Sequence, residues 1–366
     1  MKVNDVIKVL EALAPASYQE NYDNAGLITG QPGWECSGIL CSLDVTEEVV
    51  REANARNCNM IVAHHPIIFS GLKKINGKNY VEKAVIAAIK MDIAIYAIHT
   101  NLDNTAAGVN GKIAEKIGLG KLEVLAPKEN HLRKLYAFVP EDHAGAVRDA
   151  IFATGAGHIG NYSECSFNIR GKGTFKAGEG ADPYLGEVGK RHQADEVKIE
   201  VIFPAWLQSG VISALLDAHP YEEVAYDIIP LGNYFKEVGS GLVGELPEPM
   251  EEVRFLYMLK TSFGLTVIRH TPLRGRPVKR VAVCGGAGSF LIRNALSMAA
   301  DVYVTADVKY HEFFDAEGEM VIADIGHFES EQFTTDLLIE ILQQKFPTFA
   351  VLKTTVNTNP VRYFAG

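Results

Sequence analysis

The sequence lacks the features that would place the chain in a membrane, in a disulfide-bonded scaffold or on nucleic acid. None of its apolar runs approaches the roughly 20 residues that a helix needs to cross a bilayer. Its five cysteines are odd in number and form no C-x-x-C pair, which argues against a disulfide framework and a cysteine-based zinc site. The formal net charge is −10, whereas a general grip on nucleic acid needs clustered Lys and Arg. We therefore expect a soluble protein in a reducing cytoplasm.

The 366 residues suffice for two or three domains, at about 100–200 residues per domain. The first part of the chain alternates short apolar runs with helical patterns, and the same rhythm resumes after residue 239. Continuous apolar strands separated by helices indicate a mostly parallel sheet with helices on both faces. We predict strands at 38–43, 60–63, 93–98, 278–284, 302–305 and 320–324, and helices at 46–57, 81–91 and about 329–345.

The middle of the chain follows a different pattern. Its predicted order is close to the β-α-β-β-α-β arrangement of a ferredoxin-like unit, and such a unit can be inserted into another domain with little strain. Its predicted strands cover 133–139, 162–170, 173–178, 198–204 and 223–231, and its helices 142–157 and 205–219. We therefore predict an α/β host domain split into residues 1–128 and 239–366, with an inserted α+β domain at 129–238.

Three apolar runs each end in side chains that bind metals. MIVAHHP, IAIYAIHTNLDN and MVIADIGHFESE all follow this design. Ligands of open α/β sheets bind outside the carboxyl ends of the strands, so these ends can converge on one site. Imidazole and carboxylate together suit Zn, Fe, Mn or Co and disfavour Ca. We predict a two-metal centre with zinc as the first choice, formed by His64, His65, Asp103, His327 and Glu331.

The individual ligands differ in how well the pattern supports them. Asp103 and Glu331 can each bridge two cations, and two metals roughly 3.5–4 Å apart activate water and stabilise an anionic transition state. Asp103 lies in NLDN and could instead cap a helix or form an Asx-turn. Glu329 competes with Glu331, but the four-residue spacing from His327 favours Glu331 because both then share one helix face.

Other polar residues near the same strand ends are candidates for supporting roles. His99 is, with Glu331, a candidate catalytic residue, although it could equally be a core histidine. His99, His311 and Asp324 could each support a ligand through a hydrogen bond. We expect Thr305 and Asp307, at another strand end, to line the same cavity.

A glycine-rich turn, VAVCGGAGSF, follows a predicted strand. Its glycines could let backbone N–H groups approach a phosphate. It fails as a dinucleotide fingerprint because Leu291 stands where the third glycine would be. A tight strand–helix turn beside the pocket is the favoured interpretation.

The motifs IVAHHPIIF, HTNLDN, HFESE and YDNAGL resemble the signatures of the Nif-three family. The resemblance implies a dinuclear metal centre with the five ligands above, a relation to type-2 homologues of GTP cyclohydrolase I, and a toroidal homohexamer. It also favours a substrate-binding role for Asp23 and Asn24, which otherwise read as a turn. The insert resembles CutA and PII-like trimerising modules through HPYEEVAYDI. The resemblance says little about the reaction.

Two functions fit these residues. The leading hypothesis is a metal-dependent hydrolase with two divalent ions per subunit, acting on a nucleotide-like or phosphorylated small molecule. The alternative is a non-enzymatic ring assembly with a regulatory or partner-binding role, in which the metal is structural. Binding of nucleic acid is disfavoured by the net charge.

Overall fold

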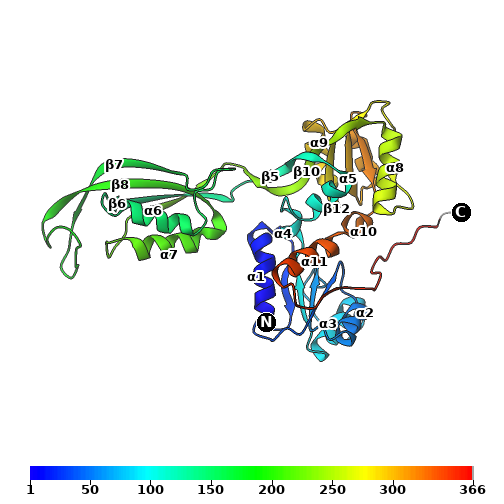
Figure 1. Cartoon of the computed structure of the whole chain (residues 1–366), viewed down its shortest axis with the longest axis horizontal. Helices are drawn as coiled ribbons and strands as arrows, with labels where there is room; N and C mark the ends of the chain where they lie inside the picture. The colour runs from blue at the N-terminus through cyan, green and yellow to red at the C-terminus, as the bar shows by residue number, and fades with distance from the viewer. Residues whose placement is uncertain (365–366) are drawn as a thin grey trace. The chain divides into compact units, whose positions relative to one another are not determined.

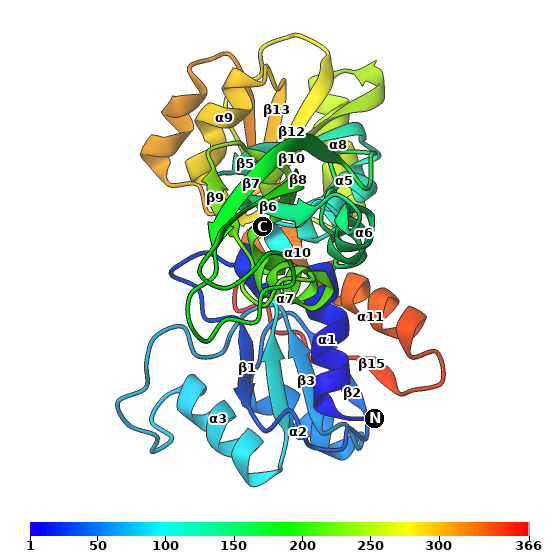
Figure 2. The ribbon, with the colours of Figure 1, turned by 90° about the vertical axis from the view of Figure 1, so that its left-hand side faces the viewer.

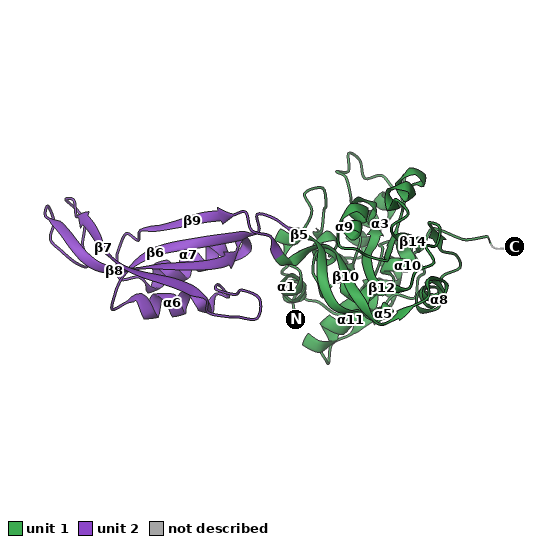
Figure 3. Ribbon diagram, turned by 90° about the horizontal axis from the view of Figure 1, so that it is seen from above, with its two compact units in different colours: residues 1–127, 236–366 green, residues 128–235 purple. Residues whose placement is uncertain are grey.

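The computed structural model describes residues 1–364 and divides the chain into two units (Figure 3). Unit 1 is formed by Met1–Pro127 and Lys236–Gly366, and unit 2 by Lys128–Phe235. Every residue that we predict for the metal centre belongs to unit 1.

One sheet of unit 1 has five strands in the order β1 (Gly26–Thr29), β4 (Ala94–Ala97), β3 (Met60–Ala63), β2 (Ile39–Ser42) and β15 (Val351–Lys353). All neighbours are parallel except β1 and β4. Successive side chains face two cores: Leu40 and Ile61 pack with helices α2 (Glu47–Ala55) and α3 (Tyr80–Lys90), whereas Cys41 and Val62 pack on the side of α1 (Val3–Leu13) and α11 (Thr334–Lys345) (Figures 1 and 2). Burial on both faces explains why these strands are apolar throughout.

The other sheet of unit 1 has six strands, in the order β11 (Arg269–His270), β14 (Val321–Asp324), β13 (Val302–Ala306), β12 (Val278–Ala287), β10 (Phe235–Met250) and β5 (Gly120–Lys128). Strands β12, β13 and β14 are parallel, and β10 and β11 pair antiparallel at either side. Helices α5 (Val109–Ile117) and α8 (Glu252–Phe263) pack on one face and α9 (Ile292–Ser297) on the other.

The prediction of a single sheet in the host is therefore wrong, because unit 1 contains two mixed sheets. An apolar run indicates that a strand is buried, but which strands pair in a sheet depends on contacts between segments far apart in the chain. Strand β15 illustrates this: it follows α11 near the end of the chain and pairs with β2, near the start.

Two further differences have local causes. The predicted C-terminal helix is broken into α10 (His327–Glu331) and α11. The sequence analysis missed strand β10, which contains Pro247 and Pro249, because proline cannot donate to a sheet ladder and argues against a strand.

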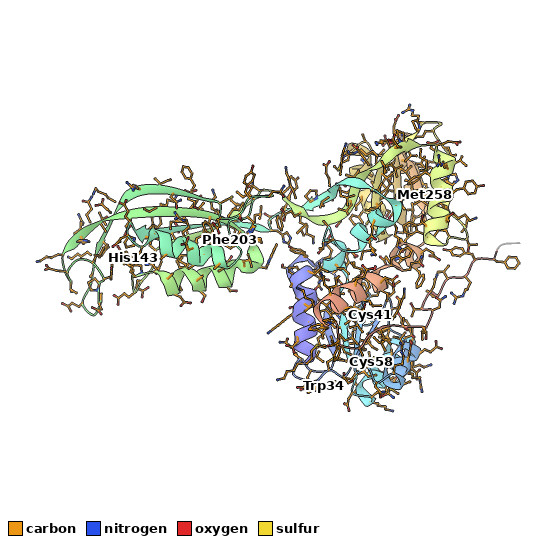
Figure 4. All side chains as sticks on the ribbon, in the orientation of Figure 1. Trp34, Cys41, Cys58, His143, Phe203 and Met258 are labelled. Carbon is orange, nitrogen blue, oxygen red and sulfur yellow. The ribbon has the colours of Figure 1, made fainter. Side chains whose placement is uncertain are left out.

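Unit 2 has the element order β6 (Leu132–Pro140), α6 (Ala144–Ala153), β7 (Ser166–Lys176), β8 (Arg191–Pro204), α7 (Gln208–Ala218) and β9 (Tyr226–Leu231). Its antiparallel sheet has the order β7-β8-β6-β9, which is the ferredoxin-like arrangement. Helices α6 and α7 pack on one face, over a core that includes Phe203 (Figure 4). The predicted strand pair at 162–170 and 173–178 is wrong: β7 is one continuous strand, and Gly173 allows the Glu196 side chain to pass close to its backbone.

The lengths of the helices and the state of the cysteines bear on the class of protein. Among the described residues, no helix combines the length and apolar character that a membrane crossing needs. The five cysteines are all free, and buried Cys41 and Cys58 lie in the layers of the five-stranded sheet (Figure 4).

Candidate metal centre

The five predicted ligands lie together at the carboxyl ends of strands from both sheets of unit 1. His64 and His65 follow β3, and Asp103 ends α4 (Thr100–Asp103), the single turn after β4. His327 opens α10 and Glu331 closes it, just beyond β14. The expectation that strand ends deliver the ligands is thus met by β3 and β4 of one sheet and β14 of the other.

The five predicted ligands form two triads that share Glu331, and His64 and His65 also form a group with His99. In the first triad, Glu331 Oε2 lies 3.0 Å from His65 Nε2 and 3.1 Å from His327 Nε2, and the two Nε2 atoms are 3.4 Å apart. In the second, His64 Nε2 lies 3.5 Å from Asp103 Oδ1 and 3.9 Å from Glu331 Oε1. Within each triad all ligand atoms lie within 4.8 Å of one another. The geometry therefore makes Glu331 the shared residue, whereas Asp103 belongs to one triad.

Each histidine of the triads is oriented by a partner at Nδ1. His64 Nδ1 donates to the Ile98 carbonyl at 2.8 Å. His65 Nδ1 lies 2.8 Å from Asp44 Oδ1, and His327 Nδ1 lies 2.7 Å from Asp307 Oδ2. A carbonyl can only accept, so His64 carries its proton on Nδ1, and the two carboxylates favour the same tautomer. The three Nε2 atoms therefore point into one space and can ligate a metal once their protons are displaced.

In the metal-free protein, some ligands of the cluster carry protons that a bound cation could replace. Burial lowers the pKa of His64 to about 3, so this residue is neutral. Burial also opposes charge on His65 and His327, but the carboxylates on both sides of each ring raise their pKa values to about 10 and about 9. Burial raises the pKa of Glu331, yet His327 and His65 outweigh it and hold that pKa well below its usual range. Without metal, two imidazolium protons balance the cluster, and a divalent cation can take their place.

Unpartnered atoms give an independent test of whether these residues fit a metal. Five buried side-chain nitrogen or oxygen atoms in residues 1–364 lack a hydrogen-bond partner, and three of them are His64 Nε2, Asp103 Oδ1 and Glu331 Oε2. His65 and His327 lie within ion-pair distance of Glu331 Oε2, at 3.0 and 3.1 Å, without forming a hydrogen bond to it. Burial, and then the charge of Glu331, raise the pKa of Asp103 well above its usual value. A cation would supply the missing partner of all three atoms, so the residues fit the metal.

The glycine-rich turn at the end of β12 packs against Glu331. The N–H of Gly285 donates to Asn110 Oδ1 at 3.0 Å, and that of Gly286 to Ser330 Oγ at 2.9 Å. Gly286 has φ +60°, and a Cβ there would overlap Glu331 Oε1. Both of these N–H groups are occupied, and the missing Cβ of Gly286 allows Glu331 to approach closely.

His99 is held beside the cluster by Asp23. Its Nδ1 lies 2.8 Å from Asp23 Oδ1, and Asp23 Oδ2 accepts from the Thr100 N–H at 3.0 Å and hydroxyl at 2.6 Å. Burial raises the pKa of Asp23, but these hydrogen bonds lower it to about 2. The His99 ring meets those of His64 and His65 edge-on, at centroid distances of 5.2 and 5.4 Å. The predicted substrate contact of Asp23 is wrong, because its side chain is 0% exposed and positions His99 instead.

The other predicted substrate residues have mixed outcomes. Asn24 donates to the carbonyl of residue 68 at 2.7 Å, and Thr305 is fully buried under the glycine turn. Neither borders the two cavities beside the cluster, so their predicted substrate contacts are not supported. Asp307 does border one of them, as the partner of His327.

The remaining candidates for supporting roles separate clearly. Asp324 accepts from the N–H groups of Val308 and Gly326, and thereby fixes the turns that carry Asp307 and His327. His311 is exposed and packs against the rings of Tyr310 and Phe314. His311 does not support a metal ligand in this structure, because none of its contacts is with the cluster.

The sequence analysis missed Asp44, which orients His65. Its Oδ1 is the partner of His65 Nδ1, and its Oδ2 accepts from the Thr358 hydroxyl at 2.7 Å. A signal existed, because Asp44 follows a predicted buried strand at the same sheet edge as His64. A single acidic residue after a strand is too common to stand out alone.

Two cavities reach the cluster from different sides. The histidine cavity, of about 570 Å³, borders His65, His327 and Asp44. The aspartate cavity, of about 560 Å³, borders Asp103 and Glu331. His99, His327 and Phe69 border both. A ligand in either cavity would meet the cluster directly.

Comparisons with known proteins agree with this architecture. The family model Duf34/NIF3 (NGG1p interacting factor 3) matches residues 1–360. The chain belongs to the Duf34/NIF3 family. It is 39% identical over 363 residues to a protein of Halalkalibacterium halodurans and 37% identical over 363 residues to one of Bacillus subtilis, each named GTP cyclohydrolase 1 type 2 homolog; the matches cover 98% of this chain and 98% and 97% of the relatives.

Solved structures of the NIF3 family give the same result. A Bacillus cereus protein related to NIF3 superposes with a TM-score of 0.87 at 39% identity, covering 100% of this chain and 99% of that one. A Staphylococcus aureus protein gives a TM-score of 0.79 at 29% identity, with the same coverage. The predicted family resemblance is confirmed.

Proposed function

We propose that this NIF3-family protein is a metal-dependent hydrolase with a dinuclear centre, acting on a nucleotide-like or phosphorylated small molecule. The observation that carries the proposal is the pair of triads sharing Glu331, with three buried ligand atoms that have no hydrogen-bond partner. Nitrogen and oxygen donors favour zinc, with iron, manganese or cobalt as alternatives. The names of the relatives support a hydrolytic reaction on a nucleotide-like substrate.

The residues divide the work of such a site. Divalent cations bound there supply Lewis acidity and lower the pKa of coordinated water. Glu331 would hold both ions because it belongs to both triads, and the carboxylates at His65 and His327 fix the ring orientations. His99 borders both cavities with Nδ1 held by Asp23, so its Nε2 is available to accept or donate a proton.

Metal analysis of ligand variants tests the assignment. By elemental analysis we expect about two ions per subunit in the wild type, about one in Asp103→Asn, and few in Glu331→Gln, because only Glu331 belongs to both triads. Glu329→Gln is the matched control, since Glu329 belongs to neither. Near-stoichiometric metal in His65→Ala or Glu331→Gln would contradict the ligand assignment.

Turnover is tested by screening metal-loaded protein against nucleotides and phosphoesters, with Glu331→Gln as the control. Activity that survives in this variant does not come from the cluster. The competing function, a ring assembly with structural metal, is distinguished by coordination: a catalytic ion keeps a position for water, whereas a structural one is closed. X-ray absorption spectra showing closed shells, together with no turnover, would favour the structural role.

We also propose that the protein assembles as a toroidal homohexamer in which unit 2 trimerises. The support is the sheet face of unit 2 opposite α6 and α7, where Phe167 and Ile169 of β7 and Ile229 of β9 are 65%, 44% and 41% exposed. Exposed apolar groups on one face are typical of an interface. Light scattering after size exclusion should give a hexamer for the wild type and smaller species for Phe167→Asp. An unchanged mass would contradict the role of this face.

A further inference from the structure

The charges around the two cavities narrow the substrate class. Among their lining residues, Arg269 is the sole lysine or arginine. Its guanidinium lies 3.1 Å from Asp324 Oδ2, donates to the Val308 carbonyl and rests over the Phe313 ring. The nearby loop carries Lys73, Lys74 and Lys78, but none of these borders either cavity. Among the described residues that line the two cavities, the one lysine or arginine is thus already paired with a carboxylate.

The carboxylates of the cluster would neutralise most of the positive charge of two bound metal ions. Two divalent ions would bring four positive charges, and Glu331, Asp103, Asp44 and Asp307 bring four negative ones. Glu329 adds another carboxylate on the histidine cavity. Sites that bind several phosphates normally present Arg or Lys forks or helix N-termini. A triphosphate would thus enter a space whose charges are already balanced or acidic.

The walls of the histidine cavity favour a flat ring instead. Phe69, Tyr80, Phe328 and Tyr363 provide aromatic surface around it. Glu329 faces the same space, with Oε1 accepting from Asn359 Nδ2 at 3.0 Å. A carboxylate accepts up to about four hydrogen bonds, so Glu329 has capacity for N–H donors of a ligand. The other carboxylates on this cavity, Asp44, Asp307 and Asp324, are already engaged with His65, His327 and a backbone N–H. Apolar walls with few polar groups are typical of sites for small heterocycles.

Resting on the proposed function, we propose that the histidine cavity binds a planar, N–H-donating heterocycle such as a purine base or nucleoside, with Glu329 as the acceptor, and disfavours polyphosphates. His65 and His327, the two predicted metal ligands that border this cavity, mark where the reacting end of the ligand meets the metal cluster. The substrate then reaches the metals through its ring or a single substituent, and not through a phosphate chain.

Calorimetric titration of full-length, metal-loaded protein tests this, with guanosine and the Mg²⁺ complex of GTP as probes and the metal content checked afterwards. Guanosine should bind at least about tenfold more tightly than GTP. Glu329→Gln should weaken guanosine by about tenfold, as expected for a hydrogen bond to a charged group. Glu248→Gln, an exposed carboxylate outside both cavities, should leave its affinity unchanged. Glu329→Asp, which keeps the charge but retracts it, serves if the Gln variant loses metal or does not fold.

Three results would overturn the inference. They are GTP binding as tightly as guanosine or more tightly, no guanosine binding at about 1 mM, and a loss in the Glu329 variants no larger than in Glu248→Gln. Turnover is scored separately. If guanosine binds more tightly than GTP but no substrate is hydrolysed, the proposed hydrolase is contradicted and the binding assignment stands. If a substrate is hydrolysed but GTP binds more tightly than guanosine, the hydrolase proposal stands and the binding assignment is contradicted.

Discussion

Gly286 offers a way to disturb the metal centre without removing a ligand. Its φ is +60°, and a Cβ at this position would overlap Glu331 Oε1 and lie 3.2 Å from His327 Cε1. Gly286→Ala should therefore cost roughly 1–2 kcal/mol for the left-handed backbone and also displace the shared carboxylate. Displacement of even a supporting group typically lowers metal affinity by about 10–100-fold, and Glu331 serves both triads. We expect the affinity for both ions to fall by at least that factor.

Gly264→Ala is the matched control. Gly264 closes α8 with φ +65°, and a Cβ there would meet nothing within 4 Å. It carries the same backbone cost without the clash. Both variants should melt about 2–8 °C lower as metal-free protein, at about 2–4 °C per kcal/mol for a unit of this size. Chelator competition should then show weakened metal binding in Gly286→Ala alone. Wild-type affinity in Gly286→Ala, or equal losses in both variants, would refute the reasoning.

Three other predictions follow from contacts around the cluster and from the C-terminal segment. Asp44→Asn and Asp307→Asn should each weaken metal binding by about 10–100-fold while leaving the ligands in place, measured by chelator competition; unchanged affinity would deny these carboxylates their orienting role. Metal binding at pH 7 should release about two protons per subunit, because the metal-free pKa values of His65 and His327, about 10 and about 9, exceed 7. The affinity for metal should therefore rise with pH up to about pH 9–10. Calorimetry in buffers of different ionisation enthalpy measures the proton release, and its absence would contradict the prediction. Burial raises the pKa of Glu52, but hydrogen bonds from two threonines after β15 lower it to about 2. Glu52→Gln should therefore cost about 1–3 kcal/mol at neutral pH, and the wild-type advantage should fade as pH drops from about 4.5 through 2; a constant difference in urea denaturation between pH 7 and pH 3 would contradict the linkage.

The sequence predicted the strand ends well because their physics is local. His64 and His65 follow an apolar run that can only be a buried strand, and the structure ends β3 at Ala63. The spacing of His327 and Glu331 predicted a shared helix face, and α10 provides it. Local pattern was sufficient because each segment carries both the strand and its terminal ligands.

The sequence could not show which segments meet. The ligands come from the ends of strands in two sheets, and not one. Which strands share a sheet depends on contacts between distant segments, as in the pairing of β15 with β2. The family resemblance favoured a substrate role for Asp23, and the sequence could not show whether its carboxylate is exposed in a turn or buried. The structure separates these two cases through the contact of Asp23 with His99, 76 residues away in the chain. The same limit explains why Asp44 was missed.

The sharing of Glu331 sets the order in which the protein can mature. His64, His65 and Asp103 are synthesised before unit 2, and His327 and Glu331 after it. While unit 2 is being made, a nascent chain thus holds one of the three residues of the first triad and two of the three residues of the second. Neither proposed ion would have its full set of ligands until α10 is made, so metal loading would follow translation of nearly the whole chain. Chains that end before α10 should therefore bind metal more weakly than the full-length protein.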